Sequence, residues 1–133
     1  MAERLLRCAV LYALLGIGMG MVMAGSHDFS SRGVHVHINL LGWVSMALMA
    51  LVYRAFPRMA AHPLARVQFW LHNIGLPVMM VGLYQLLHGQ VSAEPIVGVG
   101  SVIVSLAFVA FALNAWWPMG RTAAQPDAKE VVA

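Results

Sequence analysis

Two histidines one residue apart carry the strongest chemical signal in this chain. His35 and His37 lie near the start of an apolar stretch that runs from residue 34 to residue 56. An imidazole in lipid is costly unless a partner binds it, and neutral histidine is a common ligand of metal ions and of heme iron. Helical residues two apart point about 200° away from each other. The pair therefore predicts one imidazole for each of two separate sites, not two ligands for one ion.

Each histidine shares its helix face with different neighbours. Leu41 follows His37 on one face, and Asn39 and Gly42 follow His35 on the other. Gly42 leaves room for a large planar group or for a close helix. We therefore include Asn39 and Gly42 among the candidate cofactor-binding residues, behind His37 and His35.

Two further histidines are expected at the same membrane level as the pair. His27 follows the first apolar stretch and His88 ends the third, so both are candidate metal ligands. Two histidines on facing helices make a six-coordinate heme site. His37 and His88 are one candidate pair within a subunit, and two copies of His37 across a symmetric interface are another. Arg32 is the cation nearest to this level and a candidate partner for heme propionates.

The other polar groups lie deeper or on the opposite side. His62 is expected in a solvated loop, whereas His72 and Asn73 lie inside the third stretch, just before Pro77. Polar groups inside a membrane are functional candidates, so this pair is a candidate ligand, proton relay or quinol contact. Pro77 is expected to bend or loosen the helix. The structural alternative for His72 is a hydrogen bond to a polar residue of a neighbouring helix, namely Ser45, Ser105 or Asn114.

Composition assigns the chain to the membrane proteins. Of its 133 residues, 61% are hydrophobic and 10% are charged, against about a quarter charged in a soluble domain. The net charge of +3 comes from basic residues between apolar stretches, which favours topology signals over nucleic-acid binding. A single cysteine, Cys8, excludes an intrachain disulfide. We also find no phosphate-binding glycine loop, no paired-cysteine zinc site and no nucleophile constellation.

Four apolar stretches have the length of membrane-spanning helices. Because the connectors are short, the predicted fold is all-α, an antiparallel up-down four-helix transmembrane bundle over residues 1–119, followed by a short cytoplasmic tail at 120–133. The predicted spans are residues 5–24, 34–56, 67–87 and 95–117.

Arginine placement predicts the orientation of these spans. Cations concentrate before the first span and in the second connector, so both termini and that connector are expected in the cytoplasm. The predicted location is a bacterial inner membrane, which the chain crosses several times. The arginines that carry this prediction are Arg4, Arg7, Arg54, Arg58 and Arg66.

Residues 34–85 resemble the catalytic subunit of heme-copper oxidases, with C-type cytochrome c oxidases and nitric oxide reductases as the most similar members. The resemblance is carried by His35-Val36-His37-Ile38-Asn39-Leu40-Leu41-Gly42-Trp43-Val44, Tyr53, Pro57, Phe69-Trp70-Leu71 and Ile74-Gly75. In that family a His-x-His pair sends one imidazole to a high-spin heme and the next to a low-spin heme. The resemblance therefore implies the high-spin role for His35 and the low-spin role for His37.

The family's large subunit has three groups of four helices, and this chain resembles one group. The expected function is b-type heme binding for electron transfer or redox sensing, in a homo-oligomer, with a quinol or a cytochrome c as candidate redox partner. The chain has no further histidine cluster for an active-site copper, so oxygen or nitric oxide reduction is not expected of this chain alone.

Two alternatives belong to other functional classes. The first is a copper-binding or copper-handling membrane protein, since methionine sulfur and histidine suit copper. Its candidate ligands are Met23, His27, Asp28, His35 and His37. The second is a structural accessory subunit of a respiratory oxidase, in which His35 and His37 serve assembly only.

Overall fold

The computed structural model describes residues 1–119, and 91% of them are helical, with no strand in this part of the chain. The prediction of an all-α protein is confirmed. The tail predicted at residues 120–133 lies outside the described residues. The elements are α1 (Ala2–Ser26), α2 (Arg32–His37), η1 (Ile38–Ser45), α3 (Met46–Ala55), α4 (Pro57–Ala61), α5 (Pro63–Leu87), η2 (Val91–Ala93) and α6 (Glu94–Met119).

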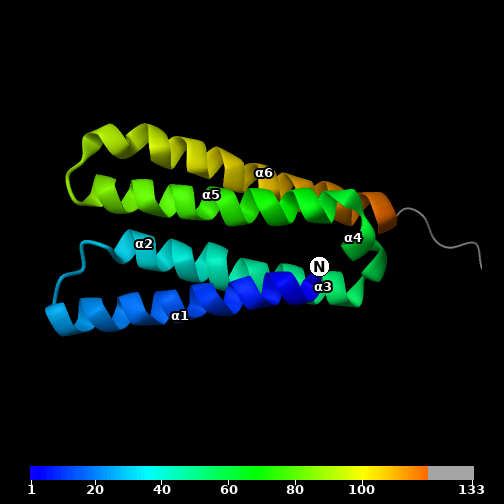
Figure 1. Ribbon diagram of the computed structural model, residues 1–133, viewed down its shortest axis with the longest axis horizontal. Coiled ribbons are helices and arrows are strands. Elements are labelled where there is room, and N and C mark those ends of the chain that lie inside the picture. Colours follow the sequence, from blue (N-terminus) through cyan, green and yellow to red (C-terminus); the bar gives the residue numbers. More distant parts are fainter. Residues whose placement is uncertain (120–133) are drawn as a thin grey trace, which may run out of the picture.

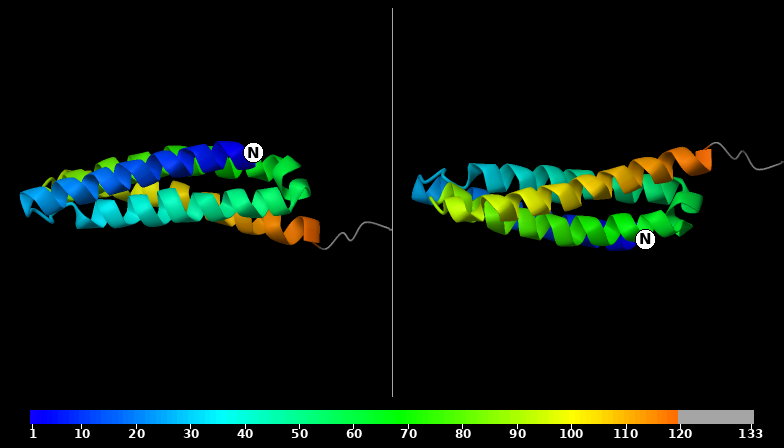
Figure 2. Two further views of the ribbon diagram at one scale, coloured as in Figure 1. Left: turned by 90° about the horizontal axis from the view of Figure 1, so that it is seen from below. Right: turned by 90° about the horizontal axis from the view of Figure 1, so that it is seen from above.

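Two helical hairpins lie side by side (Figure 1). In the first, α1 pairs with the continuous helix over residues 32–55, which consists of α2, η1 and α3. In the second, α5 pairs with α6, and the short helix α4 joins the two hairpins. The N-terminus, α4 and the far end of α6 lie at one end of the molecule (Figures 1 and 2). The loops that close the hairpins lie at the other end.

Three helices are long and apolar enough to cross a membrane: residues 2–26, 32–55 and 91–116. Much of their outer surface is apolar, as shown by exposed fractions of 70% for Val22 and 60% for Val102. A protein that is surrounded by water rarely exposes so many aliphatic side chains, because each one is costly to hydrate. These helices therefore support assignment to the membrane proteins. α5 is not among the three, since Gln68, His72 and Asn73 lie along it.

α5 begins four residues before the predicted third span. The Nδ1 atom of His62 accepts a hydrogen bond from the Leu64 amide at 3.2 Å, and Pro63 occupies the first helical position. A side-chain cap followed by proline is a strong helix start. His62 is therefore the N-cap of α5 and not a plain loop residue. Pro77 does not interrupt α5, which continues to Leu87.

The second hairpin is packed backbone against backbone. A Cβ added at Gly82 would lie 2.8 Å from the Val97 amide nitrogen, and one at Gly75 would lie 2.9 Å from that of Val104. From the other side, a Cβ at Gly100 would clash with the backbone of Met79. Small residues at such positions allow two helices to approach closely in lipid. Glycine thus determines how tightly α5 and α6 pack.

Candidate functional site

His35 and His37 point to opposite sides of the helix over residues 32–55. The Nδ1 atom of His35 lies 2.9 Å from the carbonyl oxygen of Gly16 on α1. The Nδ1 atom of His37 lies 2.7 Å from the carbonyl oxygen of Gly33, one turn back on its own helix. A carbonyl oxygen only accepts, so Nδ1 is the donor in both rings, and a neutral ring then has its lone pair on Nε2. The two imidazoles thus face different surroundings but use the same nitrogen to bond to a backbone carbonyl.

α1 fills the His35 face. The amide nitrogen of Asn39 donates to the carbonyl of His35 at 2.8 Å, and its side chain lies directly over Gly16. Gly42 lies under the ring of Tyr12, with only 2.6 Å between an added Cβ and Tyr12 Cγ. The space at Gly42 was expected to hold either a large planar group or a closely packed helix. The structure shows the closely packed helix, α1. Within one chain, the His35 face is a helix–helix contact.

The His37 face borders a groove of about 320 Å³ between this helix, α5 and α6. His37 is half-buried, and within residues 1–119 its Nε2 atom has no hydrogen-bond partner. The walls are mainly apolar, with two serine hydroxyls on α6. The other lining residues are Leu41, Met79, Ser101, Val104, Ser105 and Phe108. A half-buried imidazole with its tautomer fixed by a backbone carbonyl is the usual arrangement of a histidine that binds a metal or heme iron.

The helix is wound as a π-helix over Ile38–Ser45, directly after His37. π-Turns are rare and occur frequently at functional sites. Here the Leu41 carbonyl accepts a hydrogen bond from Nε2 of His72 on α5 at 3.0 Å, and the Ser45 hydroxyl donates to the Leu40 carbonyl at 2.8 Å. These side chains satisfy carbonyls of the π segment. The sequence carries no recognised signal for this winding.

His72 is completely buried, and its Nδ1 atom has no partner in the described part of the chain. Its ring also lies 5.6 Å from that of Phe108, between centroids. The hydrogen bond expected with another side chain goes instead to the Leu41 backbone. His72 therefore links the second hairpin to the π segment that follows His37.

His88 lies at the loop end of the molecule and lines a second cavity of about 470 Å³, together with Met19, Met23 and Asp28. Its Nδ1 atom lies 2.7 Å from the carbonyl oxygen of Tyr84, and its Nε2 atom lies 3.4 Å from the Ser30 hydroxyl. The groove at His37 is a different space with no lining residue in common. Within one chain, His37 and His88 do not face a common cavity.

The remaining candidates at this end are exposed. His27 is the C-cap of α1 with a φ of 55°, and Arg32 lies over the ring of Phe29 at 5.6 Å. The Ser30 amide and hydroxyl hold the pKa of Asp28 below its ordinary value, so this carboxylate stays anionic near neutral pH. Within residues 1–119, no three or more His, Cys, Asp or Glu side chains gather as metal ligands. The residues proposed for copper are thus not assembled into one cluster.

At the opposite end, sequence reasoning missed a buried polar cluster. The Tyr53 hydroxyl lies 3.4 Å from Gln68 Oε1, and the Asn114 amide donates to the Met59 carbonyl at 3.0 Å. All three side chains are buried. They tie α3, α5 and α6 to the turn at α4, so their role is structural. Their spacing of 15 and 46 residues gives no local signal.

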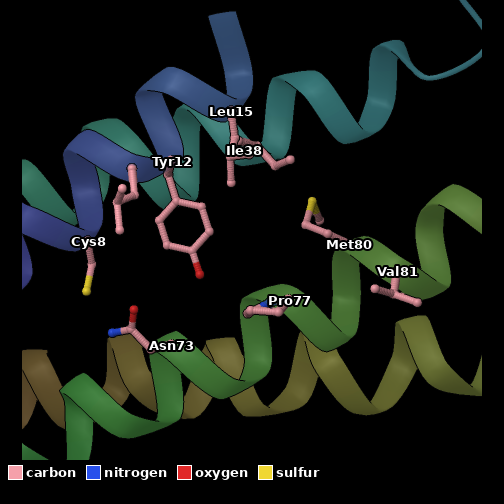
Figure 3. Close-up of a pocket in the computed structure, with 9 residues that line it drawn as sticks. Cys8, Tyr12, Leu15, Ile38, Asn73, Pro77, Met80 and Val81 are labelled. Atoms are coloured by element: carbon pink, nitrogen blue, oxygen red, sulfur yellow. The ribbon is translucent and has the colours of Figure 1, made fainter. Parts of the chain in front are cut away.

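Asn73 and Tyr12 line a third cavity, which α1, Ile38 and α5 enclose (Figure 3). Asn73 donates its amide proton to the Phe69 carbonyl at 2.8 Å. Tyr12 was not among the predicted site residues.

Comparison of the chain with protein-family models, curated proteins and solved structures found no match.

Proposed function

We propose that this chain is a b-type heme-binding integral membrane protein that transfers electrons or senses redox state, with His37 as an axial ligand of the heme iron. The resemblance to the heme-copper oxidase catalytic subunit and the geometry of His37 both support this assignment. When bound, the heme supplies one-electron chemistry. The chain supplies the imidazole, fixes its tautomer and surrounds it with apolar walls.

One observation carries the proposal: the His37 ring donates Nδ1–H to the Gly33 carbonyl and keeps Nε2 free beside a groove. A ligating histidine needs this orientation, because its second nitrogen must be held while the first one binds iron. His35 is the second candidate and His88 the third. His35 is already packed between Gly16 and Gly20 of α1, which favours His37 over it.

We further propose that the second axial ligand comes from another copy of the chain. The groove at His37 opens on the surface of one chain, and His88 lines a different cavity. Two copies related by a two-fold axis would present the same histidine twice. A homo-oligomer with a heme between two His37 rings accounts for both facts.

The proposed setting is a bacterial inner membrane crossed by four antiparallel helices, with both termini in the cytoplasm. The arginine-rich segments support this orientation, because Arg4, Arg54 and Arg58 lie on elements that meet at one end of the molecule, while Arg32 follows the opposite loop. α5 would be the fourth span, since the other helices cover two of its polar side chains, Gln68 and His72, both of which are 0% exposed.

The test is a reduced-minus-oxidised absorption spectrum of the purified protein. We expect wild type to show a Soret band and sharp α and β bands, and His37→Ala to lose at least nine-tenths of this signal. His62→Ala is the control, because His62 lies outside the groove and only caps α5. A full spectrum in His37→Ala would reject this residue as a ligand. A colourless wild type supplied with heme would reject heme binding.

A copper-binding function has one observation in its favour. Met19 and Met23 share their cavity with His88 and Asp28, and thioether sulfur with imidazole suits Cu(I). Elemental analysis separates the two functions: a copper protein would contain copper, lose it in Met19→Leu/Met23→Leu, and show no heme spectrum. An accessory subunit would lose neither cofactor in any histidine variant and would change only in assembly.

A further inference from the structure

The cavity between the two hairpins is separate from the groove at His37. It measures about 410 Å³ and lies between α1 and α5, with Ile38 of η1 on its wall (Figure 3). Its size is typical of small-molecule sites. Most of the lining is apolar. It includes Leu11, Leu15 and Val81, which are also exposed on the outer surface. A molecule dissolved in the lipid could therefore reach it from the side.

Two polar groups interrupt this apolar lining. Figure 3 shows the Tyr12 hydroxyl extending from α1 toward α5, and the side chain of Asn73 rising from α5 toward α1. Asn73 uses its amide nitrogen for the Phe69 carbonyl, so its Oδ1 atom is the one left as an acceptor. Within residues 1–119, no hydrogen bond to the Tyr12 hydroxyl is found. The cavity thus offers a donor from one side and an acceptor from the other.

Two further residues place these groups. Gly42 gives the Tyr12 ring its space, because a Cβ there would lie 2.6 Å from Tyr12 Cγ. Pro77, which also lines the cavity, has no amide proton to donate to the carbonyl of Asn73 one turn back. In lipid, hydroxyl and carbonyl groups without partners are costly. A ligand with complementary oxygens would satisfy them.

We propose that this cavity binds the head group of a membrane-soluble quinol, the reduced form of a quinone. One ring hydroxyl of the quinol accepts from the Tyr12 hydroxyl, and the hydroxyl on the opposite side of the ring donates to Asn73 Oδ1. An acyl chain would fit the apolar walls but would leave both polar groups unpaired. The inference concerns binding only and goes beyond the proposed heme site, since His37 does not line this cavity.

The experiment measures binding of decylubiquinol, kept reduced under anaerobic conditions, to the full chain in nanodiscs, with empty nanodiscs as the background. We expect saturable binding by wild type, and an affinity about tenfold lower in Tyr12→Phe and in Asn73→Ala, the size expected for one lost hydrogen bond in an apolar site. Tyr84→Phe is the matched control, because Tyr84 lines the other cavity. It should bind as wild type does.

A second ligand and a third variant complete the test. Decylbenzene has the same tail without the ring oxygens, so we expect it to bind weakly and equally to wild type and Tyr12→Phe. Leu15→Trp should fill the cavity and abolish binding while circular dichroism remains that of a folded helical protein. The proposal is overturned if wild type binds no more than empty nanodiscs, if the two polar variants bind as wild type, or if decylbenzene binds as tightly as decylubiquinol. These outcomes are independent of the heme spectrum.

Discussion

The two hairpins use glycine in different ways. In α5 and α6, glycines bring one backbone against the other, as at Gly82 and Gly100. In the first hairpin, glycines of one helix hold side chains of the other: Gly20 lies against the His35 ring and Gly42 against the Tyr12 ring. In the second hairpin glycine therefore brings two backbones into contact, whereas in the first it makes room for the side chains of His35 and Tyr12.

The largest effect is expected where two backbones meet. Gly100→Ala would direct a methyl group at the Met79 backbone, which has no rotamer to escape by, so we expect a loss of about 2–3 kcal/mol in the free energy of unfolding. Denaturation in mixed micelles, followed by circular dichroism, measures it. Gly98→Ala is the control, since nothing lies within 4 Å of its added Cβ. Equal stability of the two variants would contradict the proposed difference between the hairpins.

A smaller effect is expected where glycine holds a side chain. Gly42→Ala would place a methyl group 2.6 Å from Tyr12 Cγ and 2.7 Å from its Cβ, so we expect a loss of about 1–2 kcal/mol, since the ring can turn but Cβ moves only with α1. Tyr12→Ala in the same chain removes the Cγ contact and keeps the Cβ contact, so it should recover part of this loss, and a double-mutant cycle measures the coupling. Gly18→Ala, which has open space around it, should be neutral or slightly stabilising. Additive effects at Gly42 and Tyr12 would show that the two residues do not interact.

The smallest effect is expected at the hydrogen bond from His72 to the Leu41 carbonyl, one of those that join the hairpins. His72→Leu removes the donor to the Leu41 carbonyl, and such bonds within membranes are worth about 0.5–1.5 kcal/mol. His72→Gln keeps an N–H donor and should recover part of the loss in the same unfolding measurement. If heme is bound at His37, the leucine variant should also shift its α band. A leucine variant that is as stable as wild type and has an unchanged spectrum would remove His72 from this role.

The sequence predicted the helical class and the approximate helix ends, because apolar length and charge placement are properties of contiguous residues. It also predicted that His35 and His37 face opposite ways, since this follows from helical geometry alone. The start of α5 at Pro63 was missed although His62 and Pro63 carry a recognisable N-cap signal.

Other features depend on contacts between distant residues. Tyr12 reaches its cavity only because Gly42, thirty positions away, lies beneath its ring. Asn114 bonds to the Met59 carbonyl, which no spacing rule predicts. In the π segment, the Leu41 carbonyl likewise accepts a hydrogen bond from His72 of another helix. These details arise from contacts between residues that are far apart in the sequence, and local patterns in a single sequence do not predict such contacts.

The π segment has a consequence for insertions and deletions in this helix. Each π-turn takes up more residues than an α-turn, so Ile38–Ser45 sets the angular phase between the histidine end and the Tyr53 end. Deleting one residue there, such as Leu40, would let the segment return to α winding while its two ends keep nearly the same angular relation, because the wider π-turn absorbs about one residue. The same deletion within α3, which is already α-helical, would instead rotate one end against the other by roughly 100°. The π segment is thus a place where this helix can change its length without turning His37 away from its groove.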